Sequence, residues 1–333
     1  PTPFLMHMAR AGKKRRTREW TAGVSAVLAL TVLLVVLISS ASHARPGAGE
    51  LQEAESASPF TGRAVESLET LSFHASVQDI QYGPFPNQVL DWYNPLNERS
   101  TPQPVIVFSH GGGFAMGDEA IQPNEDPWNA LLANGYAIAS VRYRLAPETV
   151  FPESANDLGK AVQFIRAHSS EFNADPSRII LYGVSAGGTM ASYIAFGPDL
   201  ARPESEVYEE RFSSLPNTLV IQNGATDWRL YDKKIPGVYF GTATLGDVPK
   251  NTVEQASAVW YVEHGAPVIP TLALYTTPIS GPPLTSIHNA YNGFLLHKAL
   301  RAQNPETPNA FYAQATRPLG LVIAEWLEQT QPP

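Results

Sequence analysis

Short apolar runs alternate with amphipathic stretches along most of this chain. Apolar runs bounded by Pro, Gly or polar residues are typical of buried parallel strands, and apolar positions three and four apart are typical of helices. The apolar runs predict strands at 88–93, 104–109, 135–143, 178–184, 219–222, 270–275 and near 310–315. The helical spacing predicts helices at 154–168, 186–196, 287–301 and 318–329. This alternation favours an α/β fold with a mostly parallel central sheet and helices on both faces.

The segment near the start of the chain has a different pattern. A basic cluster at 13–18 precedes an uncharged, largely apolar stretch at 20–44, which ends in small residues that suit cleavage after Ala44. These are the three parts of an export signal, and the stretch also reaches the ~20 residues that an uncleaved membrane anchor needs. In either case the basic flank stays in the cytoplasm. We therefore expect residues 1–44 to be a signal peptide or an N-terminal anchor that contacts the membrane through 20–44, with the rest of the chain exported.

Composition and charge exclude several classes of function for residues 45–333. Residues 45–75 are rich in small and polar residues and predict a linker, which leaves one domain at 76–333. The net charge is −8, and the first 50 residues carry +5, so the rest carries −13, which disfavours binding to nucleic acid. Cysteine is absent, which excludes disulfides and thiolate metal sites, and the histidines lack metal-ligand spacing. We expect no cofactor and no metal.

The first turn that can carry chemistry is a Gly-x-Ser-x-Gly pattern from Gly183 to Gly187. It directly follows the predicted 178–184 strand and opens the predicted 186–196 helix. In that context the turn is so tight that the central residue, Ser185, takes a strained backbone conformation and stands above the sheet at a helix N-terminus, where the dipole favours a developing anion. The pattern therefore predicts a nucleophilic serine, and its alternative is an ordinary strand-to-helix turn.

The second such turn is the run from His110 to Phe114, which follows the predicted 104–109 strand and contains three consecutive glycines. Glycines let the backbone approach a ligand and aim bare N–H groups at it, as an oxyanion hole requires. A phosphate-binding loop is disfavoured because no Gly-Lys-Ser/Thr follows. Because parallel strands end at one edge of a sheet, we expect this turn to lie beside Ser185.

Taken with these two turns, the chain resembles the α/β-hydrolase superfamily, in particular hormone-sensitive-lipase-like esterases and related bacterial carboxylesterases. The resemblance covers roughly residues 80–200. It is carried by His110–Phe114, Tyr143–Glu148, Phe151–Pro152 with Asp157, Asp175–Arg178 and Gly183–Gly188. It implies a nucleophile at Ser185 that forms an acyl-enzyme with a small-molecule ester, and an oxyanion hole from the backbone N–H groups of Gly112, Gly113 and Ala186.

The chain departs from the family where the catalytic histidine and acid are usually found. The order in this fold is Ser, acid, His, with the histidine after the last strand. Here the loop at 316–318 holds no histidine, and the loop at 276–283 holds no carboxylate. Of the histidines that follow Ser185, His264 precedes its strand and His297 lies in a predicted helix. His288 is therefore the candidate base.

The candidate acid is Asp227, which follows the 219–222 strand. An acid one strand back from its usual place can still orient a histidine, because the role depends on geometry. Its alternative is a turn aspartate that bonds its own backbone. Two functions stay open: an exported serine esterase with Ser185, His288 and Asp227 as an irregular triad, or a degenerate hydrolase that binds a ligand and turns over little.

Overall fold

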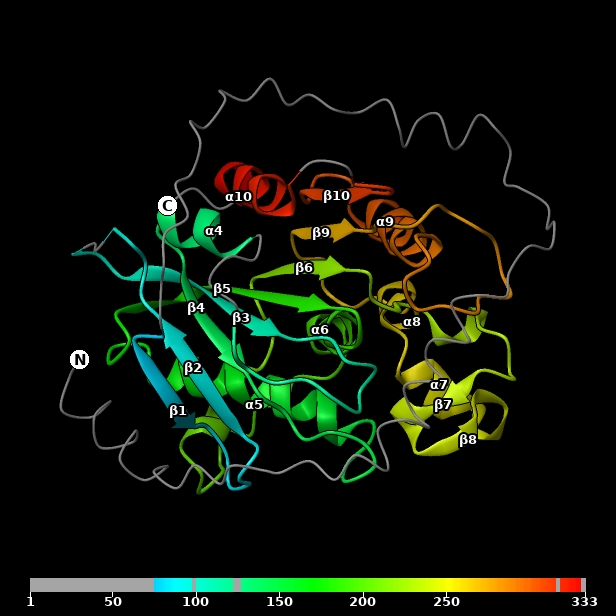
Figure 1. Ribbon diagram of the computed structural model, residues 1–333, viewed down its shortest axis with the longest axis horizontal. Coiled ribbons are helices and arrows are strands. Elements are labelled where there is room, and N and C mark those ends of the chain that lie inside the picture. The colour runs from blue at the N-terminus through cyan, green and yellow to red at the C-terminus, as the bar shows by residue number, and fades with distance from the viewer. Residues whose placement is uncertain (1–74, 98–99, 122–126, 316–317, 331–333) are drawn as a thin grey trace, which may run out of the picture.

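The computed structural model describes residues 75–97, 100–121, 127–315 and 318–330. Their centre is an eight-stranded sheet in the order β1-β2-β4-β3-β5-β6-β9-β10 (Figure 1). The β1–β2 and β2–β4 pairs are antiparallel and all other neighbours are parallel. The strands are β1 (Val77–Gln81), β2 (Val89–Tyr93), β3 (Gln103–Ser109), β4 (Ala137–Val141), β5 (Ala174–Val184), β6 (Thr218–Gln222), β9 (Thr271–Leu274) and β10 (Asn309–Tyr312).

Helices cover both faces of the sheet because alternate side chains of the central strands point to opposite sides. Val105 and Val107 of β3 pack in one hydrophobic cluster, and Ile106 and Phe108 pack in the other. The second cluster includes α4 (Trp128–Ala133) and α10 (Leu319–Thr330). The first includes α5 (Glu153–Ala167), α6 (Ala186–Phe196), α7 (Lys250–Gln255), α8 (Ala258–Glu263) and α9 (Tyr291–Gln303).

The α/β fold predicted from the sequence is confirmed, and each predicted strand and helix is present within a few residues of its predicted bounds. The sequence pattern missed the edge strand β1, the short helices α4, α7 and α8, and the two-stranded pair β7 (Pro236–Gly237) and β8 (Thr242–Thr244). Elements this short do not establish a hydrophobic period. The predicted helix at 287–301 begins later, at Tyr291, and His288 lies in the turn before it.

The predicted targeting segment at 1–44 lies outside the described residues, as does the predicted linker up to residue 74. Among the helices that the structure describes, none combines the length and the apolar composition that crossing a bilayer requires.

The carboxyl ends of four neighbouring parallel strands meet at one edge of the sheet. Ser109 of β3 pairs with Gly183 of β5, and Gln222 of β6 pairs with Val184 of β5 and with Leu274 of β9. The segments that follow β3, β5, β6 and β9 therefore start side by side, although they are far apart in the sequence. The predicted nucleophile, base, acid and oxyanion-hole residues all lie on these segments.

Candidate active site

Ser185 occupies the sharp turn between β5 and α6. Its backbone has φ 56° and ψ −116°, a conformation that non-glycine residues rarely adopt. The flanking glycines are required by close backbone contacts. A Cβ atom at Gly183 would collide with the backbone of Gly187, and one at Gly187 would collide with the carbonyl oxygens of Ser109 and His110. The pattern thus builds the strained serine turn that the sequence predicts, with the Ser185 side chain partly exposed at the N-terminus of α6.

The glycine-rich turn after β3 lies against this serine. A Cβ atom placed on Gly111 would lie 3.2 Å from Cβ of Ser185. Gly112 and Gly113 have φ angles of 112° and 59°, which glycine adopts without strain. In the part of the chain that the structure describes, the N–H groups of Gly112, Gly113 and Ala186 donate no hydrogen bond. These donors are therefore available to an anionic oxygen beside Ser185.

Aromatic contacts hold the glycine-rich turn in place. Tyr143 donates its hydroxyl hydrogen to the carbonyl oxygen of His110 at 2.9 Å, and the two rings stack at 4.4 Å. Burial lowers the pKa of the His110 imidazole, which keeps the ring neutral. Phe114 stacks on Tyr239 at 4.3 Å, and its carbonyl oxygen accepts a hydrogen bond from the N–H of Ala146. The turn is thus held at both ends, so its N–H donors are fixed in position before a ligand binds, as an oxyanion hole requires.

His288 is brought directly to the serine. Its Nε2 lies 2.8 Å from Oγ of Ser185, from a turn between β9 and α9. The Thr277 hydroxyl donates to the carbonyl oxygen of His288, and the N–H of His288 donates to Oγ of Ser286 at 3.2 Å. Partial desolvation lowers the pKa of the His288 imidazole, so the ring is neutral and can accept a proton near pH 7. Among the described residues, no carboxylate is hydrogen-bonded to this imidazole.

Asp227 does not contact His288, contrary to the triad expected from the sequence. Its carboxylate is almost fully buried and accepts hydrogen bonds from Arg229, at 2.8 Å from Nε, 2.6 Å from Nη2 and 3.0 Å from the backbone N–H. Arg229 also pairs with Glu263. A guanidinium two residues away thus takes both carboxylate oxygens, and Asp227 is the turn aspartate of the alternative interpretation.

Polar residues that the sequence analysis did not single out organise the turn around His288. Asn289 donates from Nδ2 to Oγ of Ser280 at 2.6 Å and accepts the N–H of Tyr291 at Oδ1. Asn292 is fully buried at the start of α9. In the sequence these residues form a cluster of Ser, Thr and Asn next to His288, which is equally typical of any loop. The burial of the Asn292 side chain is visible only in the fold.

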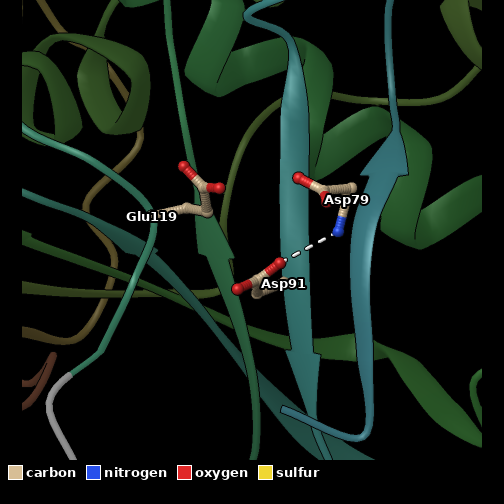
Figure 2. Close-up of side chains that lie close together, drawn as sticks. All are labelled: Asp79, Asp91 and Glu119. Carbon is tan, nitrogen blue, oxygen red and sulfur yellow. Dashed lines mark hydrogen bonds between the residues drawn. The ribbon is translucent and has the colours of Figure 1, made fainter. Parts of the chain in front are cut away.

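A second cluster of titratable side chains lies near β1 and β2, with two strands between β2 and β5. Asp79, Asp91 and Glu119 each place one carboxylate oxygen within 4.8 Å of the others, and Asp91 accepts the N–H of Asp79 at 3.0 Å (Figure 2). Burial raises the pKa of Asp91 to about 6 and that of Glu119 to about 8. The carboxyl group of Glu119 already accepts a hydrogen bond from Nη2 of Arg142 at 2.7 Å. A cation would have to displace this guanidinium, so we assign no metal to the cluster.

Comparison with known proteins gives a family and a fold. A family model described as BD-FAE matches residues 90–273, more than half of the chain. The chain is 40% identical over 98 residues to Lipase 2 of Moraxella sp. (strain TA144), which is 29% of this chain and 22% of that lipase. It is 36% identical over 104 residues to Esterase LipI of Mycobacterium tuberculosis, which is 31% of this chain and 32% of that esterase. The matches thus span about a third or less of these relatives.

A solved structure described as a truncated form of a carbohydrate esterase from gut microbiota superposes with a TM-score of 0.62. The superposition covers 78% of this chain and 97% of that one, at 18% sequence identity. At this identity the likeness shows the fold alone. It is the α/β-hydrolase fold, with the mostly parallel sheet described above.

Proposed function

The chain belongs to the BD-FAE family, and we propose that it is a serine-dependent carboxylic ester hydrolase that acts on small-molecule esters. The observation that carries the proposal is the 2.8 Å contact between Oγ of Ser185 and Nε2 of His288. A serine within hydrogen-bond reach of a neutral imidazole is the arrangement of an activated nucleophile. The esterase and lipase names of the curated relatives support the same reaction class.

The geometry supports the following reaction. Ser185 Oγ attacks the ester carbonyl carbon while His288 Nε2 takes its proton. The oxyanion that forms accepts hydrogen bonds from the N–H groups of Gly112, Gly113 and Ala186. His288 then returns the proton to the leaving alkoxide, which departs as the alcohol and leaves the acyl-enzyme. Water attacks the acyl carbon, His288 takes a proton from it and passes that proton to Oγ, and the carboxylic acid is released.

The proposed base acts without an adjacent carboxylate in the described part of the chain. In a Ser-His-Asp triad the carboxylate orients the imidazole and stabilises the imidazolium that forms. Residue His288 retains exposed surface, so water can solvate part of the imidazolium in the intermediate, while burial of the rest of the ring disfavours that charge. Without the carboxylate and with partial desolvation, the proposed base is a weaker one than a triad histidine.

The test is covalent labelling together with hydrolysis. Wild type should react with a fluorophosphonate and hydrolyse p-nitrophenyl acetate, and Ser185→Ala should do neither while keeping its melting temperature. Ser170→Ala removes an exposed hydroxyl whose one hydrogen bond to a described residue goes to the adjacent Glu171, and should match wild type in both assays. Equal hydrolysis by Ser185→Ala and wild type would refute the assignment of the nucleophile.

The alternative function is a degenerate hydrolase that binds an ester-like ligand. It is favoured by one observation, the lack of a carboxylate at His288 among the described residues. A site with an oxyanion hole and a poor base retains only ~10³–10⁴-fold acceleration over water. In that case wild type would bind the ester without reacting at a measurable rate with the fluorophosphonate.

We also propose that the protein is exported, with residues 1–44 as a cleaved signal or an uncleaved anchor. The support is the sequence alone: a basic cluster, an uncharged stretch at 20–44 and small residues before position 45. Cell fractionation with protease added outside the membrane tests it, and a body that stays protected in the cytosol would exclude export. A loss of about 5 kDa would indicate cleavage after Ala44, and retention of that mass in the membrane fraction would indicate an anchor.

A further inference from the structure

The side chain of Asn292 is fully buried in the first turn of α9, four residues after His288. Its Oδ1 accepts the N–H of Thr226 and the hydroxyl of Tyr231, both at 3.2 Å. Its Nδ2 donates to the hydroxyl oxygen of Tyr231 at 2.9 Å and to the carbonyl oxygen of Asn289 at 3.0 Å. The Tyr231 hydroxyl can serve only one of these two amide atoms at a time, so three hydrogen bonds hold the side chain, to Thr226, Tyr231 and Asn289.

These bonds tie the His288 turn to the segment that follows β6. Thr226 and Tyr231 lie on that segment, and the Thr226 hydroxyl also donates to the carbonyl oxygen of Asn292 at 2.8 Å. Asn289 directly follows His288, and its carbonyl oxygen accepts the hydrogen bond from Nδ2 of Asn292. A second connection lies nearby, because the backbone of Leu284 bonds the residues on either side of Tyr231 at 2.9 Å each. The turn that carries the proposed base is thus fastened to the core at two points.

We propose that Asn292, together with Tyr231, is a positioning residue that holds His288 against Ser185 in a site without a carboxylate at the imidazole. The inference rests on the proposed esterase function. In a triad the acid fixes the ring directly. Here the residue retains exposed surface, and the position of its ring depends on the backbone of its turn, which Asn292 holds at Asn289. Asn292 contacts neither Ser185 Oγ nor the imidazole.

The experiment separates positioning from general stabilisation of the fold. The variants are Tyr231→Phe, Asn292→Ala and their combination. The matched control is Asn217→Ala, which removes an amide oxygen that accepts the N–H of Ile179 at 3.1 Å, at the amino-terminal end of β6. Melting temperatures are measured first. The kcat and KM for p-nitrophenyl acetate and the rate of fluorophosphonate labelling are then measured where all variants are folded.

Misplacing a catalytic group by 1 Å lowers the rate by ~10²-fold, so we expect kcat and the labelling rate to fall by roughly this factor in Tyr231→Phe and Asn292→Ala. KM should stay within about threefold, because substrate binding is not removed. The combined variant should be no slower than Asn292→Ala, since both residues act in one network. Asn217→Ala should lower the melting temperature and leave kcat, KM and the labelling rate unchanged.

Values of kcat within about twofold of wild type in both folded single variants would overturn the inference and leave the esterase proposal standing. A wild type that the fluorophosphonate does not label would overturn the esterase proposal, and this inference with it. If Asn292→Ala does not fold, Tyr231→Phe decides the question, because it removes a single oxygen atom from the network.

Discussion

Two adjacent glycines of the proposed oxyanion hole differ sharply in the room they leave for a side chain. At Gly112 a Cβ atom would collide with the backbone carbonyl of Met116, and φ is 112°. At Gly113 no described atom other than chain neighbours lies within 4 Å of a Cβ, and φ is 59°, in the left-handed region. The pair offers a matched test of the hole, because the substitutions are chemically identical and one residue apart.

We expect Gly112→Ala to cost about 2–6 kcal/mol locally, as the sum of backbone strain and overpacking of about 1–3 kcal/mol each. The turn can relieve this only by moving the Gly112 N–H, and loss of one oxyanion donor lowers kcat by ~10²–10³-fold. Gly113→Ala needs only the left-handed conformation, at roughly 1–2 kcal/mol of stability. Its N–H keeps its direction, so kcat should stay within about tenfold of wild type.

The assay is hydrolysis of p-nitrophenyl acetate at a temperature where circular dichroism shows both variants folded. Gly112→Ala should lose activity by far more than Gly113→Ala, and the loss should appear in kcat, because the donors act on the oxyanion of the transition state. Equal losses in the two variants, or full activity in Gly112→Ala, would refute the oxyanion hole as described.

Three further outcomes follow from the charges and pKa values. Desolvation lowers the pKa of His288, so kcat/KM should rise with pH through a midpoint below 6.5 and be constant above it; a midpoint above that value would indicate an unseen carboxylate at the ring. Asp227→Asn should lower stability by about 1–3 kcal/mol through loss of the Arg229 pairing, with kcat nearly unchanged, whereas loss of a triad acid costs ~10⁴-fold. The pKa of Glu119 is raised from 4.5 to about 8 by burial, so the folded state holds a proton that the unfolded state releases. Stability should therefore fall as pH rises from about 4.5 to 8, and Glu119→Gln should flatten that fall in urea titrations.

The sequence predicted those parts of the site that depend on local structure. A strand, a tight turn and a helix in immediate succession specify where Ser185 lies, and the three glycines after β3 specify a turn at the same sheet edge. The structure also brings His288 to Ser185, because the segment after β9 starts beside the one after β5, across β6. Each of these inferences needed only the order and direction of the strands.

The acid could not be predicted in the same way, since its partner is decided by competition between contacts. Asp227 leaves β6 at the right edge, but Arg229 is two residues away and bonds both carboxylate oxygens. A pairing between residues two positions apart does not require distant parts of the chain to come together. A guanidinium also matches a carboxylate in two parallel hydrogen bonds. Asn292 was missed for the opposite reason: its partners on the segment after β6 lie 61 and 66 residues away, and no local pattern distinguishes a buried asparagine from an exposed one.

The position of His288 has a consequence for how the site keeps its geometry. In a triad a carboxylate and an imidazole from two loops hold each other, so movement of either loop disturbs the base. Here the segment after β6 reaches the base through neutral bonds, from Thr226 and Tyr231 to Asn292. These groups are uncharged and buried, and burial raises the pKa of Tyr231 further above its ordinary value. The groups that position His288 therefore keep their charge state across the pH range in which His288 titrates. A change of pH alters the protonation of the base and leaves these hydrogen bonds intact.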